Sequence, residues 1–190
     1  SIYYEPLGGH RHSVTGEYMP GVPSLMLPVA SDGTPLEKFF PRSEWKYTVS
    51  SRKSNIQHFY TFVSPRLRAV HPSNFVRIAP DVASEQGIRS GDKVKVTTPY
   101  GAQVGEAFVT DGVASGVISI EHGFGHDEFG IRTHIVDGKP AFGIANLEKG
   151  VNHNKLGLLD PKRNGEFSLN DWLVGTCARQ ALPAKIRKIG

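Results

Sequence analysis

The chain has 190 residues, a formal net charge of +4 and a hydrophobic content of 38%, which predicts a folded unit with its own core. The small positive charge permits phosphate binding without demanding nucleic acid, and no nucleic-acid partner is expected. A single cysteine, Cys177, excludes an internal disulfide framework, a CxxC zinc site and a self-contained iron–sulfur cluster. No run approaches the roughly 18 consecutive apolar residues of a membrane span, so direct membrane insertion is not expected.

Residues 1–42 lack the periodicity of a helix or a strand, because Gly-Gly, Pro-Gly and Asp-Gly pairs and further prolines interrupt it. We expect an extended surface segment that packs on other domains of a longer parent. The chain shows no export signal, and its start without a methionine suggests processing or excision from a longer polypeptide. His10 and His12 could bind a metal ion, but no third ligand lies nearby in the sequence, and a solvated or partner-facing loop is the favoured interpretation.

A second unit is predicted over residues 43–190, and it opens with a strand at 45–49, where aromatic or β-branched residues alternate with polar ones. The small hydroxyl and basic residues that follow end this strand and can offer hydroxyls, backbone N–H groups and two cations to an anion. An ordinary polar loop is the alternative, and these residues alone favour it. The residues in question are Ser50, Ser51, Arg52, Lys53 and Ser54. Residues 56–63 are amphipathic enough for a short helix or a turn.

Residues 75–126 give the clearest pattern. Strands are predicted at 75–78, 93–97, 102–110 and 116–120, and a short helix begins at Pro80 and ends before Gly87. Short strands at this spacing predict a β-barrel with non-local pairing. The Gly91-Asp92 pair before a strand is typical of a turn rather than of a functional acid.

Two later loops can contact a ligand. His122 and His126 are spaced as metal ligands on a helix, but Gly123 and Gly125 between them disfavour a helix. A ligand-contacting loop is therefore the first interpretation, with a purely structural loop and a metal site as alternatives. The amides of Asn152 and Asn154, which flank His153, can bind the edge of a heterocycle or cap turns, and both interpretations stay open. Residues 172–188 are β-type and broken by Pro183.

The run from Phe75 to Ala83, with Gly87-Ile88 and Gly91-Asp92-Lys93, resembles the carboxy-terminal dinucleotide-binding domain of molybdopterin oxidoreductases, the molybdenum or tungsten enzymes of the dimethyl sulfoxide reductase family. The likeness reappears in the loops at 123–126 and 150–156 and covers the chain from about residue 45 to its end. Among subfamilies it resembles the catalytic subunits of tetrathionate, polysulfide or thiosulfate reductases, with tetrathionate reductase first. The resemblance implies a mainly β fold with short helices, the double-psi β-barrel.

In that family this domain covers bis(molybdopterin guanine dinucleotide) and contacts its pterin, ribose and phosphate parts. The resemblance implies that these contacts come from three loops and from one further residue near the last strand. The matching residues are Ser50, Ser51, Arg52, Lys53, Ser54 and His58, then His122, Gly123, Gly125 and His126, then Asn152, His153 and Asn154, with Arg179 as a weaker candidate. No residue of this chain is expected to be catalytic or to bind the metal, and an iron–sulfur cluster belongs only to the missing amino-terminal part.

The same resemblance implies that the parent is an oxidoreductase that reduces an oxidised sulfur compound, and that the isolated fragment is inactive. Expected partners are the remaining domains of the parent, iron–sulfur electron-transfer subunits and membrane-anchor subunits, and the expected location is outside the cytoplasmic membrane. Two other classes stay open. One is a partner- or peptide-binding barrel like the amino-terminal domains of some AAA ATPases. The other is a small stand-alone enzyme like aspartate decarboxylase, which needs an activated nucleophile that the sequence does not show.

Overall fold

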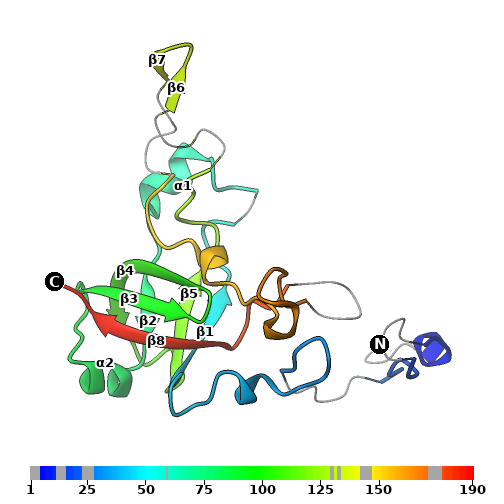
Figure 1. Cartoon of the computed structure of the whole chain (residues 1–190). Coiled ribbons are helices and arrows are strands. Elements are labelled where there is room, and N and C mark those ends of the chain that lie inside the picture. Colours follow the sequence, from blue (N-terminus) through cyan, green and yellow to red (C-terminus); the bar gives the residue numbers. More distant parts are fainter. Residues whose placement is uncertain are drawn as a thin grey trace.

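The computed structural model describes residues 5–11, 16–22, 28–58, 60–128, 131, 134–141, 147–170 and 177–190. Its centre is a closed six-stranded barrel, which lies in the lower half of Figure 1. The barrel strands are β1 (Tyr47–Arg52), β5 (Val117–Glu121), β2 (Val76–Ile78), β4 (Gly101–Val109), β3 (Lys93–Thr98) and β8 (Leu182–Lys188), in that order around the barrel. The prediction of a mainly β chain with a double-psi barrel is confirmed.

The other described elements are short. They are the helices α1 (Pro65–Val70) and α2 (Pro80–Gln86), the hairpin of β6 (His134–Val136) and β7 (Lys139–Ala141), and the 3-10 helices Glu5–Gly9, Leu36–Lys38, His153–Leu156 and Pro161–Arg163. Figure 1 shows α1 and the hairpin beyond one side of the barrel and α2 against the opposite side. No helix among the described residues is long and apolar enough to cross a membrane.

Pairing between distant strands is the feature that positions the site. β1 runs parallel to β5 and β2 runs parallel to β4, whereas the other neighbouring strands of the barrel are antiparallel. In the β1–β5 pair the last residues of the two strands, Arg52 and Glu121, stand opposite each other. The carboxyl ends of these two strands therefore meet at one edge of the barrel.

Aliphatic side chains at alternating positions of the strands fill the barrel. Their alternation is the pattern that predicted the strands, because successive side chains of a strand point to opposite faces. Fully buried examples are Val49, Val76, Ile78, Val94, Val96, Ile118 and Ile120. Helix α2 adds Val82 and Ala83 to the same core. As predicted, this helix ends at Gly87, which adopts the left-handed conformation with φ of 61°.

Two local predictions are wrong, and a third is confirmed in one of its two alternatives. The first strand does not end at residue 49, because Ser50, Ser51 and Arg52 continue β1 and pair with residues 119–121 of β5. Of the short helix or turn expected over residues 56–63, the turn is found at residues 60–63, and a helix begins at Pro65, whose ring suits the first helical position. Pro183 does not break the last strand, because it stands near the start of β8, opposite Thr48, where a missing N–H is tolerated.

The segment before the barrel divides into two parts. Ala30 and Leu36 are buried in the barrel's core cluster, and Phe39 and Phe40 pack against it. Figure 1 shows the part around Glu5–Gly9 well away from the barrel. A domain boundary at residue 42 and packing of residues 1–42 on other domains stay predictions, while residues 28–42 already contribute to the core described here.

Candidate functional site

Three segments meet at the edge where β1 and β5 end, and we call them the rim: residues 50–54, 121–126 and 150–154. The backbone N–H of His122 donates to the carbonyl oxygen of Arg52 at 3.1 Å, which joins the first two segments. The N–H of Gly125 donates at 3.0 Å to the carbonyl oxygen of Lys149, the residue directly before the third segment, which brings the second and third segments together. The loops singled out in the sequence therefore form one continuous surface.

Gly125 is required where the second and third segments touch. Its φ of 66° lies in the left-handed region that glycine adopts most easily. A Cβ atom at this position would lie 2.5 Å from the Asn152 nitrogen and 2.7 Å from the Gly150 oxygen. Both neighbours are backbone atoms that cannot rotate away, so glycine permits the close approach of the two segments.

A buried carboxylate lies behind the rim. The Glu121 side chain is only 3% exposed, and its carboxylate lies 3.0 Å from Arg52 Nη2, 2.7 Å from His71 Nε2 and 3.7 Å from Arg77 Nη2. These partners come from β1, from the residue after α1 and from β2. A charge this deeply buried is tolerated because it is paired and hydrogen-bonded.

The buried side-chain amide of Asn74 connects the second and third rim segments. Asn74 Nδ2 donates to the carbonyl oxygens of Glu121 at 2.6 Å and Val151 at 3.0 Å. In return, the N–H of Val151 donates to Asn74 Oδ1 at 2.7 Å. Sequence reasoning missed Asn74 and Glu121 as organising residues. The available signal was weak: a polar residue just before one strand, and a carboxylate that ends another directly ahead of a glycine-rich loop.

Arg68 supports the second rim segment. Its Nε donates to the Phe62 carbonyl oxygen at 2.8 Å and its Nη2 to the Gly123 carbonyl oxygen at 3.3 Å. The guanidinium also lies 4.9 Å from the centre of the Phe124 ring. Burial lowers the pKa of Arg68, although an arginine stays protonated. The glycine-rich loop is thus held by a buried cation that the sequence did not single out.

His153 is the most unusual residue of the predicted set. Its side chain is buried, and neither Nδ1 nor Nε2 has a hydrogen-bond partner among the described residues. Burial, with smaller effects from His122 and Arg179, lowers the pKa of His153 to about 4. The ring is therefore neutral at pH 7, with one nitrogen able to donate and the other able to accept. Buried polar atoms normally have partners, so this ring is suited to a bound group.

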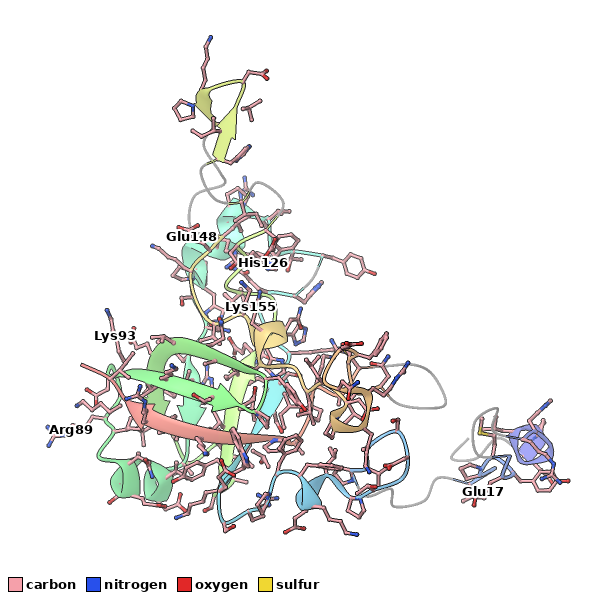
Figure 2. The ribbon with its side chains drawn as sticks, viewed as in Figure 1. Glu17, Arg89, Lys93, His126, Glu148 and Lys155 are labelled. Atoms are coloured by element: carbon pink, nitrogen blue, oxygen red, sulfur yellow. The ribbon has the colours of Figure 1, made fainter. Side chains whose placement is uncertain are left out.

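His153 and two other predicted residues share a cavity. Asn154 and Arg179 line it with His153, and so do Tyr100, Lys155, Gly157, Leu158, Leu159, Ser168, Cys177 and Ala178. Lys155 forms an ion pair with Asp127, which joins the wall of this cavity to the loop after β5. Figure 2 shows Lys155 and His126 between the barrel and α1. The structure thus brings the third rim segment and Arg179 together.

The serine hydroxyls of the first segment have structural partners. Ser50 Oγ accepts from the N–H of Ala181 at 3.3 Å, and Ser51 Oγ accepts from Gln180 Nε2 at 2.9 Å. Ser54 Oγ accepts from the N–H groups of two residues that follow it. In each case the bond uses a lone pair of the oxygen and leaves the O–H as a donor, which is the group that a phosphate oxygen needs.

The basic residues of this segment differ in their surroundings. Arg52 is anchored by Glu121, and its side chain is still 37% exposed. Lys53 and His58 are exposed. His58 Nδ1 accepts from the N–H of Tyr60 at 3.3 Å, which orients its ring toward the turn before α1. Arg52 is therefore the cation of this segment that is joined directly to the second rim segment.

Of the remaining predicted residues, Asn152 and His126 make contacts within the chain. Asn152 Oδ1 accepts from the N–H of Asn154 at 3.1 Å and so caps the 3-10 helix His153–Leu156, which leaves its Nδ2 donors outside the cap. The ring of His126 lies 4.6 Å from that of Phe62, and burial lowers the pKa of His126. Among the described residues, no three His, Cys, Asp or Glu side chains are grouped to hold a metal ion.

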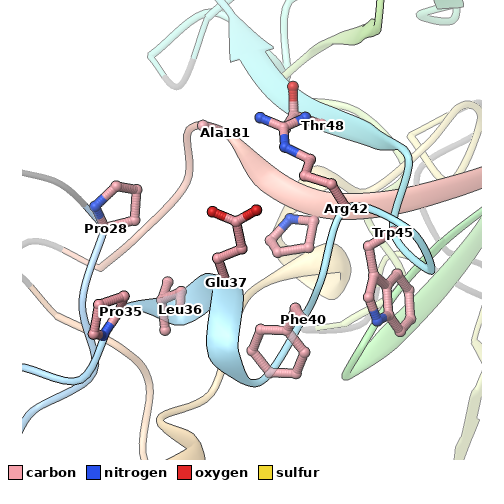
Figure 3. Close-up of a pocket in the computed structure, with 10 residues that line it drawn as sticks. Pro28, Pro35, Leu36, Glu37, Phe40, Arg42, Trp45, Thr48 and Ala181 are labelled. Carbon is pink, nitrogen blue, oxygen red and sulfur yellow. The ribbon is translucent and has the colours of Figure 1, made fainter.

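A second cavity lies where residues 28–48 meet the start of β8 (Figure 3). Figure 3 shows Glu37, Phe40, Arg42 and Trp45 around it, and prolines complete its wall. None of the site residues predicted from the sequence lines this cavity.

Comparison with known proteins identifies the family of the domain that carries this rim. The family model described as "Molydopterin dinucleotide binding domain" matches residues 47–163, which span the barrel from β1 to the third rim segment and beyond. In fold, the chain is similar to acetylene hydratase from Pelobacter acetylenicus, with a TM-score of 0.58 over 89% of this chain and 21% of that one, at 17% sequence identity.

The chain is also similar in sequence to subunits of known reductases. The chain is 39% identical to a tetrathionate reductase subunit of Salmonella typhimurium over 99% of its own length and 18% of that protein. It is 34% identical to the corresponding tetrathionate reductase subunit of Archaeoglobus fulgidus over 66% of its length and 12% of that protein. A selenate reductase subunit of Mesobacillus selenatarsenatis is 25% identical, over 99% of this chain and 19% of that protein. The chain thus spans less than a fifth of the length of these relatives, and it belongs to the molydopterin dinucleotide binding domain family.

Proposed function

We propose that this chain is the cofactor-binding domain of a molybdopterin oxidoreductase, and that its rim holds the pterin and nucleotide parts of bis(molybdopterin guanine dinucleotide). The observation that carries this proposal is His153, a buried neutral imidazole whose two nitrogens lack partners among the described residues. It lines a cavity with Asn154 and Arg179. A polar heterocycle supplies the donor and the acceptor that such a ring requires.

The rim residues, together with His58 and Arg179, fit the parts of such a group by their chemistry. Arg52, Lys53 and Arg179 supply cations for the pyrophosphate, and the hydroxyls of Ser50, Ser51 and Ser54 can donate to phosphate oxygens. The amides of Asn152 and Asn154 and the imidazoles of His58, His122, His126 and His153 offer donors and acceptors to the pterin and ribose. The backbone at Gly123 and Gly125 can approach closely because no side chain intervenes.

When bound, the metal and its dithiolenes supply the redox chemistry, and the metal can be molybdenum or tungsten. The residues of this chain bind and orient the organic part and add to the positive charge around its phosphates. We propose no catalytic residue in this chain and no activity for the chain alone, because its described elements form one barrel with a rim rather than an enclosing set of domains.

The parent that this proposal implies reduces an oxidised sulfur compound, with tetrathionate ranked first. Two relatives that carry this activity in their names are 39% and 34% identical to the chain, whereas the selenate reductase relative is 25% identical. All three are named as one subunit of a reductase, which supports further subunits in the assembly. We propose iron–sulfur electron-transfer and membrane-anchor subunits, an iron–sulfur cluster in the rest of the polypeptide, and a location outside the cytoplasmic membrane.

Cofactor content tests the proposal. The complete polypeptide that contains this chain is purified and hydrolysed in acid, and the released guanosine monophosphate is measured together with molybdenum and tungsten. We expect guanosine monophosphate at about twice the amount of metal, as a metal held by a pair of dinucleotides requires. His153→Phe should lower nucleotide and metal together, whereas the exposed control His10→Phe should not. Protein without nucleotide would overturn the proposal and favour a partner-binding barrel.

A further inference from the structure

We propose that Glu121 and Asn74 are positioning residues that hold the three rim segments in register without touching the cofactor. This inference rests on the proposed function in one respect: the rim is taken as the surface that binds the dinucleotide. The positioning itself consists of contacts within this chain, so it can also be measured with no ligand present.

The first step of the argument is the anchoring of Arg52. The exposed guanidinium of Arg52 is held at 3.0 Å by a carboxylate that is itself buried at the end of the paired strand. An arginine free in solvent loses considerable rotamer freedom when it binds an anion. Because Glu121 fixes one side of the guanidinium fork, the N–H groups on its other side are oriented before an anion arrives.

The second step concerns charge. Glu121 faces two guanidinium groups, those of Arg52 and Arg77, and the imidazole of His71. Two guanidinium groups against one carboxylate leave a formal charge of at least +1 on this cluster. The cluster therefore keeps a positive charge that attracts phosphate, although its central residue is an acid.

The third step links this cluster to the Asn152 segment. Asn74 binds the carbonyl oxygen of Glu121 and both backbone polar groups of Val151. Its Oδ1 also lies only 2.5 Å from the place that a Cβ atom on Gly150 would occupy. One buried carboxylate and one buried amide thus connect the ends of β1 and β5 with the segment that carries Asn152 and His153.

Glu121→Gln separates positioning from simple electrostatics. The substitution preserves shape and removes the negative charge, so the rim becomes more positive. If Glu121 only moderated the charge, the variant would bind a phosphate ligand more tightly. If Glu121 positions Arg52 and the strand ends, the variant binds it more weakly. The two roles therefore predict effects of opposite sign.

The binding test uses guanosine diphosphate as the probe and calorimetric titration of the full chain. We expect Glu121→Gln and Asn74→Ala to weaken binding roughly tenfold, as loss of a charge-assisted or buried hydrogen bond does. The control is Glu44→Gln, which removes an exposed carboxylate paired with Lys185 at 2.8 Å. Binding by Glu121→Gln that is equal to or tighter than that of the unaltered chain overturns the inference.

Amide hydrogen exchange decides the same question without a ligand. The N–H groups of His122 and Val151 should exchange roughly tenfold faster in Glu121→Gln and Asn74→Ala, while amides of β3 keep their rates. Unchanged rates at the rim, or equal acceleration in the rim and β3, overturn the inference. If the unaltered chain fails to bind guanosine diphosphate, that result counts against the proposed function, and the exchange rates alone decide the positioning role.

Discussion

The barrel wall and the rim are stabilised by different interactions. In the wall, fully buried aliphatic side chains such as Val96 and Ile118 pack between paired strands. The rim is stabilised by buried polar groups. Glu121, Asn74 and Arg68 form hydrogen bonds or ion pairs with residues that are distant in the sequence. The wall depends on area removed from water, whereas the rim depends on a few directional bonds.

This difference predicts how each region responds to substitution. Loss of a wall side chain leaves a cavity in the core that the strands share, so it should destabilise the whole barrel. Loss of a rim contact should open a few loops while the strands stay paired, because protection from exchange is distributed locally. The four predictions that follow are ordered from the largest expected effect to the smallest.

Ile118→Ala should destabilise the whole domain. Ile118 is fully buried in β5, and removal of three carbons from such a site costs about 4 kcal/mol of unfolding free energy. Chemical denaturation followed by circular dichroism measures the loss, and amide exchange should accelerate in the wall and the rim alike. If amide exchange accelerates only in the rim, the idea that wall substitutions destabilise the whole barrel is wrong.

Gly125→Ala should cost about 3 kcal/mol, because the new methyl group adds a left-handed backbone strain to a collision with the backbone of residues 150–152. Denaturation measures the cost, and exchange should locate it at the rim. Gly116→Ala is the matched control, since Gly116 has a φ of 75° but open space around it, and should cost about 1 kcal/mol. If Gly125→Ala and Gly116→Ala lower the unfolding free energy equally, the second and third rim segments move apart at little cost.

The pH dependence of stability should carry the signature of His153. The pKa of His153 is about 4 in the folded chain and about 6.5 in the unfolded chain. Between these two pH values the imidazole of the unfolded chain is protonated and that of the folded chain is not, so the free energy of unfolding falls as the pH is lowered. Stability should therefore fall by about 2 kcal/mol from pH 7.5 to pH 5 through this residue alone. The measurement is the difference between the unaltered chain and His153→Phe across that range. If the unfolding free energy has the same pH dependence in the unaltered chain and in His153→Phe, the lowered pKa of His153 is wrong.

Asn152→Ala should have the smallest effect, a loss of about 1 kcal/mol, because it removes the acceptor that caps the 3-10 helix His153–Leu156. Asn152→Ser retains a capping oxygen and should cost less than half as much. Denaturation of both variants provides the comparison. A serine variant as unstable as the alanine variant would indicate that the amide, and not the cap, matters for stability.

The sequence predicted the wall better than the rim. Alternation of apolar and polar residues, with turn residues between the runs, predicted five of the six barrel strands, because burial in a sheet leaves a local periodic signal. Pro80 and Gly87 marked the two ends of helix α2. The family resemblance supplied the barrel type, which the comparisons support. The same alternation failed for Ser50 to Arg52, whose polar side chains continue β1 because β5 offers a parallel partner 69 residues later.

The rim loops could be identified but not their organisation. Gly125 was expected to allow close approach, yet the sequence did not show that its neighbour is the backbone of Asn152. Asn74 and Val151 are 77 residues apart, and a bond over that distance leaves no local pattern. Charged and amide residues at strand ends have many uses, so only the fold could show that Glu121 and Asn74 are partners. The assignment of the predicted rim residues to a cofactor stays a prediction.

The last strand has a consequence for biosynthesis. β8 pairs with both β1 and β3, so the barrel closes only when residues 182–188 are present. During translation the earlier strands leave the ribosome without the neighbour that completes their hydrogen bonding, and Ser50 and Ser51 lack Gln180 and Ala181 in the same way. Loading of any bulky prosthetic group onto this domain is therefore expected to be a late event, after the ribosome has finished this part of the chain.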